Sequence, residues 1–376
     1  MKKLWLLIPL TLLCLTSYVA AEKPATRPVN IGHRGSSGRL PEHTLEAYRL
    51  AIKEGADFIE CDVSITKDLK LVCRHESWLN ETTNIWQNQT LRSRVKTYNI
   101  PASGDMPNKT VTDIFTVDLT LEELKTIRVR QKYPFRDHSF DDMYQIPTLE
   151  EYIRVAKSAD RKVGIYPELK SPEWVNSLDI IRDANTTFED LFLEVLHNNG
   201  YREKDALCFV QSFSEESIRS LSTKTRLPLV MLYDYRPPNE QDKMKNLSSI
   251  CSGIGVWKNN IIPVDQNNLQ STTDFVTNAH NNNLKVHAFT FRNENKYLAW
   301  NYSQDPYNEY QTFLNTQIDG YFTDFPGSFK RFLDMTYTEP ASKPCVGGVP
   351  SAHSSGRFYK LILSIAAFLL CVMSFA

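Results

Sequence analysis

The amino-acid sequence predicts an α/β fold, a closed (β/α)8 barrel with a segment inserted after the first hairpin arm. Short apolar runs alternate with amphipathic segments, as in parallel strands joined by crossover helices. The chain of 376 residues is long enough to bury a large core. Eight apolar runs resemble strands outside any hairpin arm, and eight parallel strands suggest closure into a barrel. These runs are 29–32, 58–63, 162–169, 206–213, 228–233, 253–257, 284–291 and 318–323.

The first residues are typical of a secretory signal peptide. Met-Lys-Lys is followed by an apolar run to about Leu15 and by small residues up to Ala21, so we expect residues 1–21 to be removed. Six Asn-X-Ser/Thr sequons are consistent with secretion and glycosylation. They lie at Asn80, Asn88, Asn108, Asn185, Asn246 and Asn301.

The first predicted strand ends in His33 and Arg34, within the stretch IGHRGSSGRLPEHTLEAY. A short loop follows, and a helix then begins. This arrangement brings an imidazole and a guanidinium to the carboxyl end of a sheet, where barrel enzymes carry their active sites. A lone histidine is more often structural than catalytic, so the prediction depends on what else lies at this end.

The second predicted strand carries two acidic residues, Glu60 and Asp62, on one face. Because the opposite face is apolar and should meet the helices, the two carboxylates are expected to point into the barrel. A buried charge there requires a cation. The alternative is a half-exposed strand with its acids in solvent.

The run Leu71 to His75 follows too closely for a parallel crossover and is predicted to be a hairpin arm. A two-residue turn at Asp68-Leu69 would place Asp62 opposite His75. In that register Cys61 and Cys73 lie on opposite faces, which disfavours a disulfide between them. A one-residue slip in the register would place both on the same face and reverse this conclusion.

Five cysteines remain once Cys14 and Cys371 are removed with the two terminal segments. The odd number means that at least one thiol is unpaired or paired elsewhere.

Residues 80–145 form a long polar segment that interrupts the regular spacing, and we interpret them as an insertion over one end of the barrel. The stretch Thr120-Leu-Glu-Glu123 is a capping box, which favours a helix within the insertion over a disordered loop. A second capping box, Thr148-Leu-Glu-Glu151, predicts the helix that follows.

The third barrel strand ends in Glu168 and Lys170, which share a face and should reach the same rim as His33 and Asp62. Three carboxylates form a hard oxygen site suited to Ca²⁺ or Mg²⁺, and zinc is disfavoured because no cysteine or histidine cluster has its spacing. Two imidazoles, one divalent ion and two cationic side chains suit attack at a phosphorus centre.

The C-terminus predicts attachment to a lipid. Small and polar residues from Gly347 to Gly356 precede an apolar tail at 361–376, which resembles a glycosylphosphatidylinositol (GPI) attachment signal within residues 340–376. The alternative is a single transmembrane helix, although this tail is shorter than the roughly 20 residues that span a bilayer. The attachment residue stays open among Gly347, Ser351 and Ser354.

Several motifs, in this order, resemble those of the glycerophosphodiester phosphodiesterases: GHRG, PEHTLEAY, ECDVSITKD, VCRHE, YPELK, QSF, FTFR and DGYFTDFP. The resemblance spans about residues 29–330 and implies a TIM barrel with an insertion after the histidine-bearing arm. It implies an acid/base pair, three ligands of one Ca²⁺ or Mg²⁺, two phosphate-binding cations and a residue that orients the His33-Arg34 turn. The acid/base pair would be His33 and His75, and the metal ligands would be Glu60, Asp62 and Glu168. Arg34 and Lys170 would bind phosphate, and Glu42 would orient the turn.

The chain departs from the family pattern at two positions. His43 stands where the family often has Asn, and Leu69 stands where it often has Gly. We expect neither change to touch a proposed ligand.

The leading functional prediction is a metal-dependent enzyme at the cell surface that cleaves glycerophosphodiesters to glycerol 3-phosphate and an alcohol. The resemblance also implies that a substrate hydroxyl attacks first and that water opens the resulting cyclic phosphate. The alternatives are a lysophospholipase D or sphingomyelinase-like activity and a catalytically silent surface binding protein. A net charge of −1 argues against a nucleic-acid partner.

Overall fold

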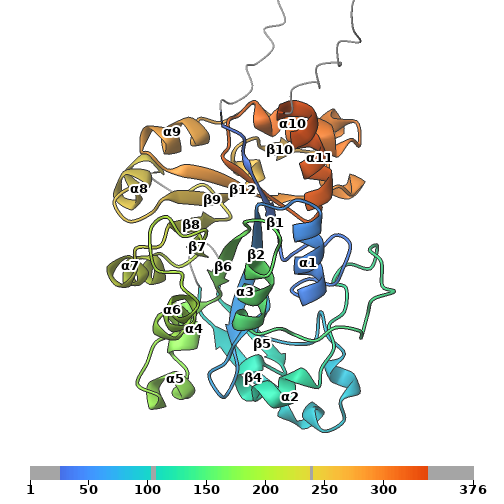
Figure 1. Cartoon of the computed structure of the whole chain (residues 1–376), viewed down its shortest axis with the longest axis vertical. Helices are drawn as coiled ribbons and strands as arrows, with labels where there is room; N and C mark the ends of the chain where they lie inside the picture. The colour runs from blue at the N-terminus through green and yellow to red at the C-terminus, as the bar shows by residue number, and fades with distance from the viewer. Residues whose placement is uncertain (1–25, 103–106, 238–239, 338–376) are drawn as a thin grey trace, which may run out of the picture. The chain divides into compact units, whose positions relative to one another are not determined.

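Eight parallel strands close into a barrel in the computed structural model, which describes residues 26–102, 107–237 and 240–337 (Figure 1). Strand β1 (Val29–Gly32) pairs in parallel with both β2 (Phe58–Ile65) and β13 (Gly320–Thr323), and this double pairing closes the ring. The predicted barrel is therefore confirmed. The predicted signal peptide and the predicted lipid-attachment signal lie outside the described residues.

All eight predicted strands are present. From β2 the ring continues through β6, β7, β8, β9 and β12 to β13. The bounds of these middle strands are β6 Gly164–Leu169, β7 Val210–Ser212, β8 Leu229–Tyr233, β9 Gly253–Trp257 and β12 Lys285–Phe291.

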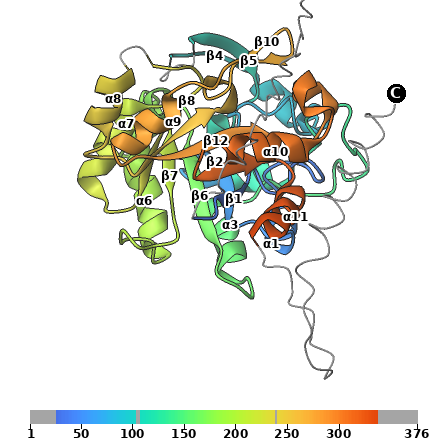
Figure 2. The same cartoon turned by 90° about the horizontal axis from the view of Figure 1, so that it is seen from above.

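Helices cover the outside of the barrel (Figure 2). They are α1 Leu45–Lys53, α3 Leu149–Lys157, α4 Pro172–Asn176, α5 Asp179–Asp183, α6 Phe188–Asn198, α7 Glu215–Lys224, α8 Glu240–Leu247, α9 Phe275–Asn281, α10 Pro306–Leu314 and α11 Pro326–Tyr337. Short pieces complete the loops after β9 and β12: η4 Lys258–Asn260, β10 Val264–Asp265, β11 Asn268–Leu269, η5 Asn295–Tyr297 and η6 Trp300–Tyr302. None of the helices in the described ranges is long and apolar enough to cross a bilayer.

Helices α1 and α3 pack against β2, the strand that carries two of the predicted ligands. The capping box at Thr148 begins α3 as predicted. From α3, the Tyr152 ring packs edge-on against Tyr48 of α1 at 4.8 Å, and its hydroxyl donates to the Ile59 carbonyl at 2.6 Å. These contacts fix β2 from outside the barrel.

The predicted hairpin forms, but its predicted register is wrong by one residue. Strand β3 (Leu71–Cys73) pairs with β2 so that Val63 faces Cys73, which brings Asp62 opposite Arg74. The reason is a three-residue loop, closed by the Thr66 N–H and the Lys70 carbonyl, in which Leu69 adopts a φ of 58°.

The observed register reverses the prediction for Cys61 and Cys73. Both side chains lie on the same face of the hairpin, buried against the helices, and both are free thiols. Burial raises the pKa of Cys61, and the neighbouring Cys73 thiol raises it further.

The segment after β3 folds around an apolar core of its own. Nine buried side chains of this segment form it, among them Leu79, Ile114 and Leu124, and Val72 of β3 joins them. The capping box at Thr120 is present, as predicted. The elements of this insertion are η1 Ile85–Gln87, η2 Leu91–Arg94, the antiparallel strands β4 Lys96–Ile100 and β5 Lys109–Asp113, η3 Thr116–Asp118 and α2 Leu121–Lys125.

The interior of the barrel is filled with large side chains below the rim. Ile31, Phe58, Tyr166 and Phe322 pack there together, and the Tyr166 hydroxyl lies 2.8 Å from Nδ1 of His287. This packing fills the centre of the barrel below the carboxyl ends of the strands.

Candidate active site

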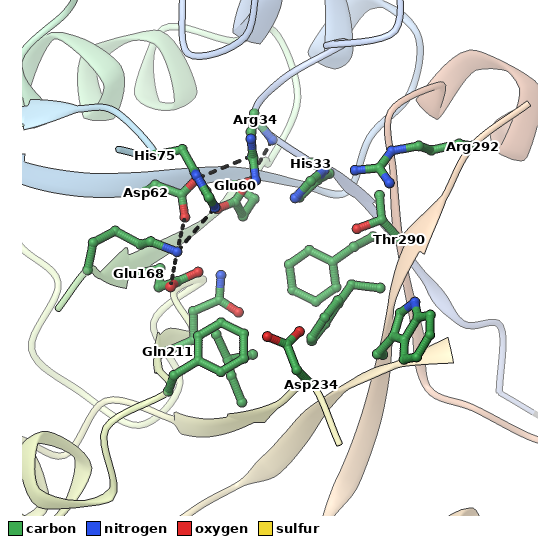
Figure 3. Close-up of a pocket in the computed structure, with 16 residues that line it drawn as sticks. His33, Arg34, Glu60, Asp62, His75, Glu168, Gln211, Asp234, Thr290 and Arg292 are labelled. Atoms are coloured by element: carbon green, nitrogen blue, oxygen red, sulfur yellow. Dashed lines mark hydrogen bonds and ion pairs between the residues drawn. The ribbon is translucent and has the colours of Figure 1, made fainter. Parts of the chain in front are cut away.

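A cavity of about 300 Å³ opens at the carboxyl ends of the barrel strands (Figure 3). Seven of the predicted site residues line it, although they come from segments up to 137 residues apart, from His33 to Lys170. These seven are His33, Arg34, Glu60, Asp62, His75, Glu168 and Lys170. The eighth, Glu42, lies behind Arg34.

Three carboxylates converge on one side of the cavity. Glu60 and Asp62 share the inner face of β2, and parallel pairing sets Asp62 in register with Glu168 of β6. One oxygen from each of the three lies within 4.8 Å of the others, and all three residues are buried.

This triad has the chemistry of a divalent cation site. Burial, and then the charge of Asp62, raise the pKa of Glu60 well above its usual value, and burial raises the pKa of Glu168 to about 8. Burial thus disfavours the charged forms of Glu60 and Glu168, and a bound cation would stabilise them. Oxygen ligands of this kind suit Ca²⁺ and Mg²⁺ alike, so the residues fit either ion.

His33 is oriented by a carboxylate from the far end of the chain. Its Nδ1 lies 2.7 Å from Oδ1 of Asp324, which only accepts hydrogen bonds when ionised, so Nδ1 carries the proton and Nε2 is left as a base. Burial and the charge of Arg34 lower the pKa of His33 to about 4, against the opposing effect of Asp324. His33 is therefore neutral near pH 7.

His75 is held in the same way by its neighbour. Nδ1 lies 2.8 Å from Oε1 of Glu76, and Nε2 accepts from Nζ of Lys170 at 3.3 Å. Burial, then Arg34 and Lys170, lower the pKa of His75 to about 3. Although the hairpin register differs from the prediction, His75 still lies beside the carboxylates, because it directly follows Arg74, whose N–H donates to the Asp62 carbonyl at 2.7 Å.

Arg34 and Lys170 place positive charge against the triad. The Arg34 N–H donates to Glu60 at 2.6 Å, and its guanidinium lies 3.0 Å from Glu42 and 3.3 Å from Asp62. Lys170 Nζ lies 2.9 Å from Glu168. Burial alone would lower the pKa of both cations, but the surrounding carboxylates outweigh it and hold both pKa values above their usual ones.

Glu42 fixes the Arg34 side chain through both carboxylate oxygens, at 3.1 and 3.0 Å. Arg34 has a φ of 57°, so its backbone makes a sharp turn at the end of β1. Both bonds come from Nη1 of Arg34, and they hold the guanidinium at the cavity in spite of this turn.

His43 contradicts the expectation that it touches no ligand. Its Nε2 lies 2.8 Å from Oδ2 of Asp62, and its Nδ1 lies 2.8 Å from the Tyr48 hydroxyl. The ring therefore bridges helix α1 to a proposed metal ligand. Leu69, at the hairpin turn, makes no contact of this kind in the hydrogen bonds and ion pairs of the described residues.

Sequence reasoning missed Asp324, which follows β13 within the motif DGYFTDFP. Its carboxylate accepts from Arg136 at 2.6 Å and from Arg292 at 2.9 Å, in addition to His33. Its position at a strand end was the available signal, since the same argument identified His33, Asp62 and Lys170.

The six predicted glycosylation sites lie at the surface. Five are exposed and Asn88 is half-buried, with its Nδ2 donating to the Thr126 hydroxyl at 3.3 Å. Nδ2 is the atom that would carry a glycan, so modification of Asn88 would place the sugar beside Thr126.

Comparison with known proteins places these residues in a family context. Residues 33–328 match the model of the glycerophosphoryl diester phosphodiesterase family. The glycerophosphodiester phosphodiesterase GDPD6 of Arabidopsis thaliana is 41% identical over 338 residues, which cover 84% of this chain and 89% of that protein. A glycerophosphodiester phosphodiesterase of Haemophilus influenzae is 28% identical over 365 residues, covering 85% and 93%.

Solved structures share the fold. A protein from Silicibacter pomeroyi superposes with a TM-score of 0.59 at 20% identity, covering 84% of this chain and 96% of its own. A phosphodiesterase from Oleispira antarctica, solved in complex with its product sn-glycerol-3-phosphate, superposes with a TM-score of 0.56 at 22% identity, covering 82% and 97%.

Proposed function

The chain belongs to the glycerophosphoryl diester phosphodiesterase family and is a phosphodiesterase; from this premise we propose that it cleaves glycerophosphodiesters by two-histidine catalysis assisted by one divalent cation. The products are sn-glycerol 3-phosphate and an alcohol. The observation that carries the proposal is the buried triad Glu60, Asp62 and Glu168 with an oriented imidazole on either side of it (Figure 3).

Ca²⁺ or Mg²⁺ held by the triad would supply positive charge to a phosphate oxygen. Arg34 and Lys170 would hold the other phosphate charge, since both cations remain protonated at any working pH. The Nε of Arg34 lies 3.3 Å from Oδ2 of Asp62, so the guanidinium stands directly beside the triad.

The two imidazoles would move the protons. One takes the proton of a substrate hydroxyl as its oxygen attacks phosphorus, and the other gives a proton to the departing alkoxide, which leaves a cyclic phosphate. Water then opens the ring, with the two roles exchanged, to give the phosphomonoester. The negative phosphodiester opposes the cations that lower the histidine pKa values, which favours protonation of the donor once substrate is bound.

We also propose that the enzyme is secreted, glycosylated and held at the cell surface by a C-terminal GPI anchor. The order of small residues, polar spacer and apolar tail supports this proposal, and so do the sequons. A single C-terminal transmembrane helix is the competing arrangement.

The direct test is hydrolysis of glycerophosphocholine and of lysophosphatidylcholine, each with and without a chelator. We expect glycerophosphocholine to be hydrolysed, activity to fall nearly to zero after chelation, and Ca²⁺ or Mg²⁺ to restore it. A preference for lysophosphatidylcholine would instead support the lysophospholipase D alternative. Full activity after exhaustive chelation would contradict the role of the cation.

Glu60→Gln provides a companion variant, because it removes one charge from the triad while keeping the shape of the side chain. We expect the metal concentration needed for half-maximal activity to rise. An unchanged metal titration would show that Glu60 is not a ligand.

A further inference from the structure

Gln211, the first residue of the stretch QSF, lies beside the metal triad and has had no role so far. Strand β7 pairs in parallel with β6 so that Gln211 is in register with Glu168, which is itself in register with Asp62 of β2. Residues in register on parallel strands point to the same side of a sheet. The Gln211 amide therefore joins the two carboxylates on the inner face, and Figure 3 shows it next to Glu168 in the cavity.

The Gln211 amide carries a buried hydrogen-bond acceptor. Only 2% of the residue is exposed, and its Oε1 has no hydrogen-bond partner among the residues that the structure describes. Buried polar atoms in native proteins almost always have a partner, and an unsatisfied one destabilises the fold. Because Gln211 lines the cavity, we expect the donor to come from a bound ligand.

The strand itself is held without this amide. The Ser212 hydroxyl donates to the Leu169 carbonyl at 3.1 Å and accepts from the Ser214 N–H at 3.2 Å. The first of these bonds ties β7 to the end of β6. The Gln211 amide is therefore available to a ligand.

The position of Gln211 limits what this ligand can be. The polar row that begins at Asp62 ends at Gln211, because the register partner of Gln211 on β8 is the apolar Val230. Phe213, two residues further along the chain, lines the same cavity nearer the rim. The donor must therefore be a small polar group that reaches the depth of the triad.

We propose that Gln211 accepts a hydrogen bond from the terminal hydroxyl of the glycerol arm, the one that does not attack phosphorus, and so selects substrates in which this hydroxyl is free. The proposal rests on the proposed function, because it takes a glycerophosphodiester as the substrate. Acylation of the same hydroxyl, as in a lysophospholipid, would remove the donor and leave the acceptor unpaired. The enzyme should therefore prefer fully deacylated diesters.

The dimensions of glycerol fit this arrangement. The attacking hydroxyl is on the middle carbon and must lie at the triad and the histidines, and the terminal hydroxyl is on the next carbon. Adjacent strands lie about 4.8 Å apart, so neighbouring hydroxyls of one small molecule can reach Glu168 on β6 and Gln211 on β7. In an in-line displacement the alcohol departs on the side of phosphorus opposite the attacking oxygen, so the head group extends away from Gln211.

A fourth oxygen ligand for the metal is the competing role of Gln211, since amide oxygens also bind Ca²⁺. The triad lies on β2 and β6, however, whereas Gln211 lies on the next strand, with Glu168 between it and Asp62. This position favours a substrate hydroxyl over the ion. Titration of the metal distinguishes the two roles.

A substrate that lacks only the terminal hydroxyl tests the proposal. Glycerophosphocholine is compared with 2-hydroxypropyl phosphocholine, which keeps the attacking hydroxyl and the head group, using the metal-loaded enzyme. We expect the wild-type kcat/KM to be about 10–100-fold higher for glycerophosphocholine. Gln211→Met keeps the volume of the side chain but has no amide, so it should reduce this ratio to within about twofold. Gln211→Asn should retain part of the preference, because it keeps the amide on a shorter side chain.

Two controls separate this role from a structural one. Thr290→Val removes a hydroxyl from β12, which lies opposite β6 in the ring of eight strands, and should keep the preference. Because Gln211 Oε1 has no partner among the described residues, Gln211→Met should not lower the melting temperature. A clear drop in melting temperature would indicate a structural role and overturn the proposal.

Three further results would overturn the proposal. The first is an unchanged preference in Gln211→Met, and the second is an equal loss of preference in Thr290→Val. The third is a higher dissociation constant for Ca²⁺ or Mg²⁺ in Gln211→Met, measured by calorimetry, which would show that the amide is a ligand of the ion.

A binding measurement separates this proposal from the proposed function. The titrants are sn-glycerol 3-phosphate and 2-hydroxypropyl phosphate, added to the metal-loaded protein and followed calorimetrically. We expect sn-glycerol 3-phosphate to bind about tenfold more tightly, and Gln211→Met to remove the difference. Equal affinities in the wild-type protein would overturn the proposal whether or not the enzyme hydrolyses phosphodiesters. Selective binding without hydrolysis would instead count against the proposed function alone.

Discussion

His43 links helix α1 to a proposed metal ligand, and its effect should therefore appear in metal affinity. The ring hydrogen-bonds to Asp62 at 2.8 Å and is itself held by Tyr48. Burial lowers the pKa of His43 despite the hydrogen bond to Asp62, so the neutral ring orients the carboxylate and adds no charge at neutral pH.

We predict that His43→Ala raises the dissociation constant for Ca²⁺ or Mg²⁺ by about 10–100-fold, the usual effect of losing a partner that orients a ligand. His43→Asn should lose less, because the amide keeps a hydrogen-bond donor. Calorimetric titration of metal measures both. His280→Ala is the control, since His280 pairs with Asp319 on the surface. Unchanged metal affinity in His43→Ala would refute this role.

The sequence predicted the positions of single residues correctly where a strand end carried the signal. His33, Glu60, Asp62 and Glu168 line the cavity because strand alternation and chain direction determine where they point. Asp324 was not predicted, because its contact with His33 spans 291 positions in the sequence and forms only when the barrel closes.

At the scale of elements, the insertion is joined to the barrel by a buried arginine. Arg136 donates to Glu294 at 2.7 Å, to Asp324 at 2.6 Å and to the Ser37 carbonyl at 3.1 Å, with 3% of its side chain exposed. This side chain holds the insertion against loops that follow β1, β12 and β13. It also holds the carboxylate that orients His33.

We predict that Arg136→Gln lowers the free energy of unfolding by about 3 kcal/mol, because it leaves buried carboxylates without one of their cations. Arg130→Gln is the matched control in the same insertion: its pair with Asp142 is about one-third exposed and should be worth less than about 1 kcal/mol. Chemical denaturation compares the two variants. Equal losses would mean that Arg136 does not anchor the insertion.

The sequence predicted that an insertion exists but not how it attaches, since no local pattern reveals a partner more than 150 positions away. The hairpin shows a similar limit. Its register shifted by one residue because Leu69 accepts a positive φ within a three-residue loop, a conformation that leucine rarely adopts. The pairing of Cys61 and Cys73 on one face follows from that single shift.

At the scale of the whole molecule, the barrel brings together residues from its first strand and from the segment after its last. β1 pairs with β13 along four residues, so His33 and Asp324 become neighbours. The overall fold could be predicted because eight strands are visible as separate apolar runs. The sequence could not predict which residues face each other across the cavity, because this depends on which strands lie opposite each other in the closed ring.

The proposed attachment to the membrane is also a property of the whole chain. We predict that a phosphatidylinositol-specific phospholipase releases the enzyme and its activity from cells that express the full sequence. Mass spectrometry of the purified mature protein should then find no peptide from residues 361–376. Detection of such peptides would favour the transmembrane alternative.

The central claim is that His33 and His75 carry the protons of a phosphodiester displacement. Each side chain lies at the rim, and general acid–base catalysis is typically worth about 10²–10⁴-fold in rate. The deciding measurement is kcat with glycerophosphocholine, recorded beside the melting temperature, for His33→Ala, His75→Ala and the double variant, with His280→Ala as control. We predict that each single variant loses about 10²–10⁴-fold in kcat and stays folded, and that the double variant loses less than the product of the two. Near-normal turnover in either single variant, or collapse of the fold in both, would contradict the claim.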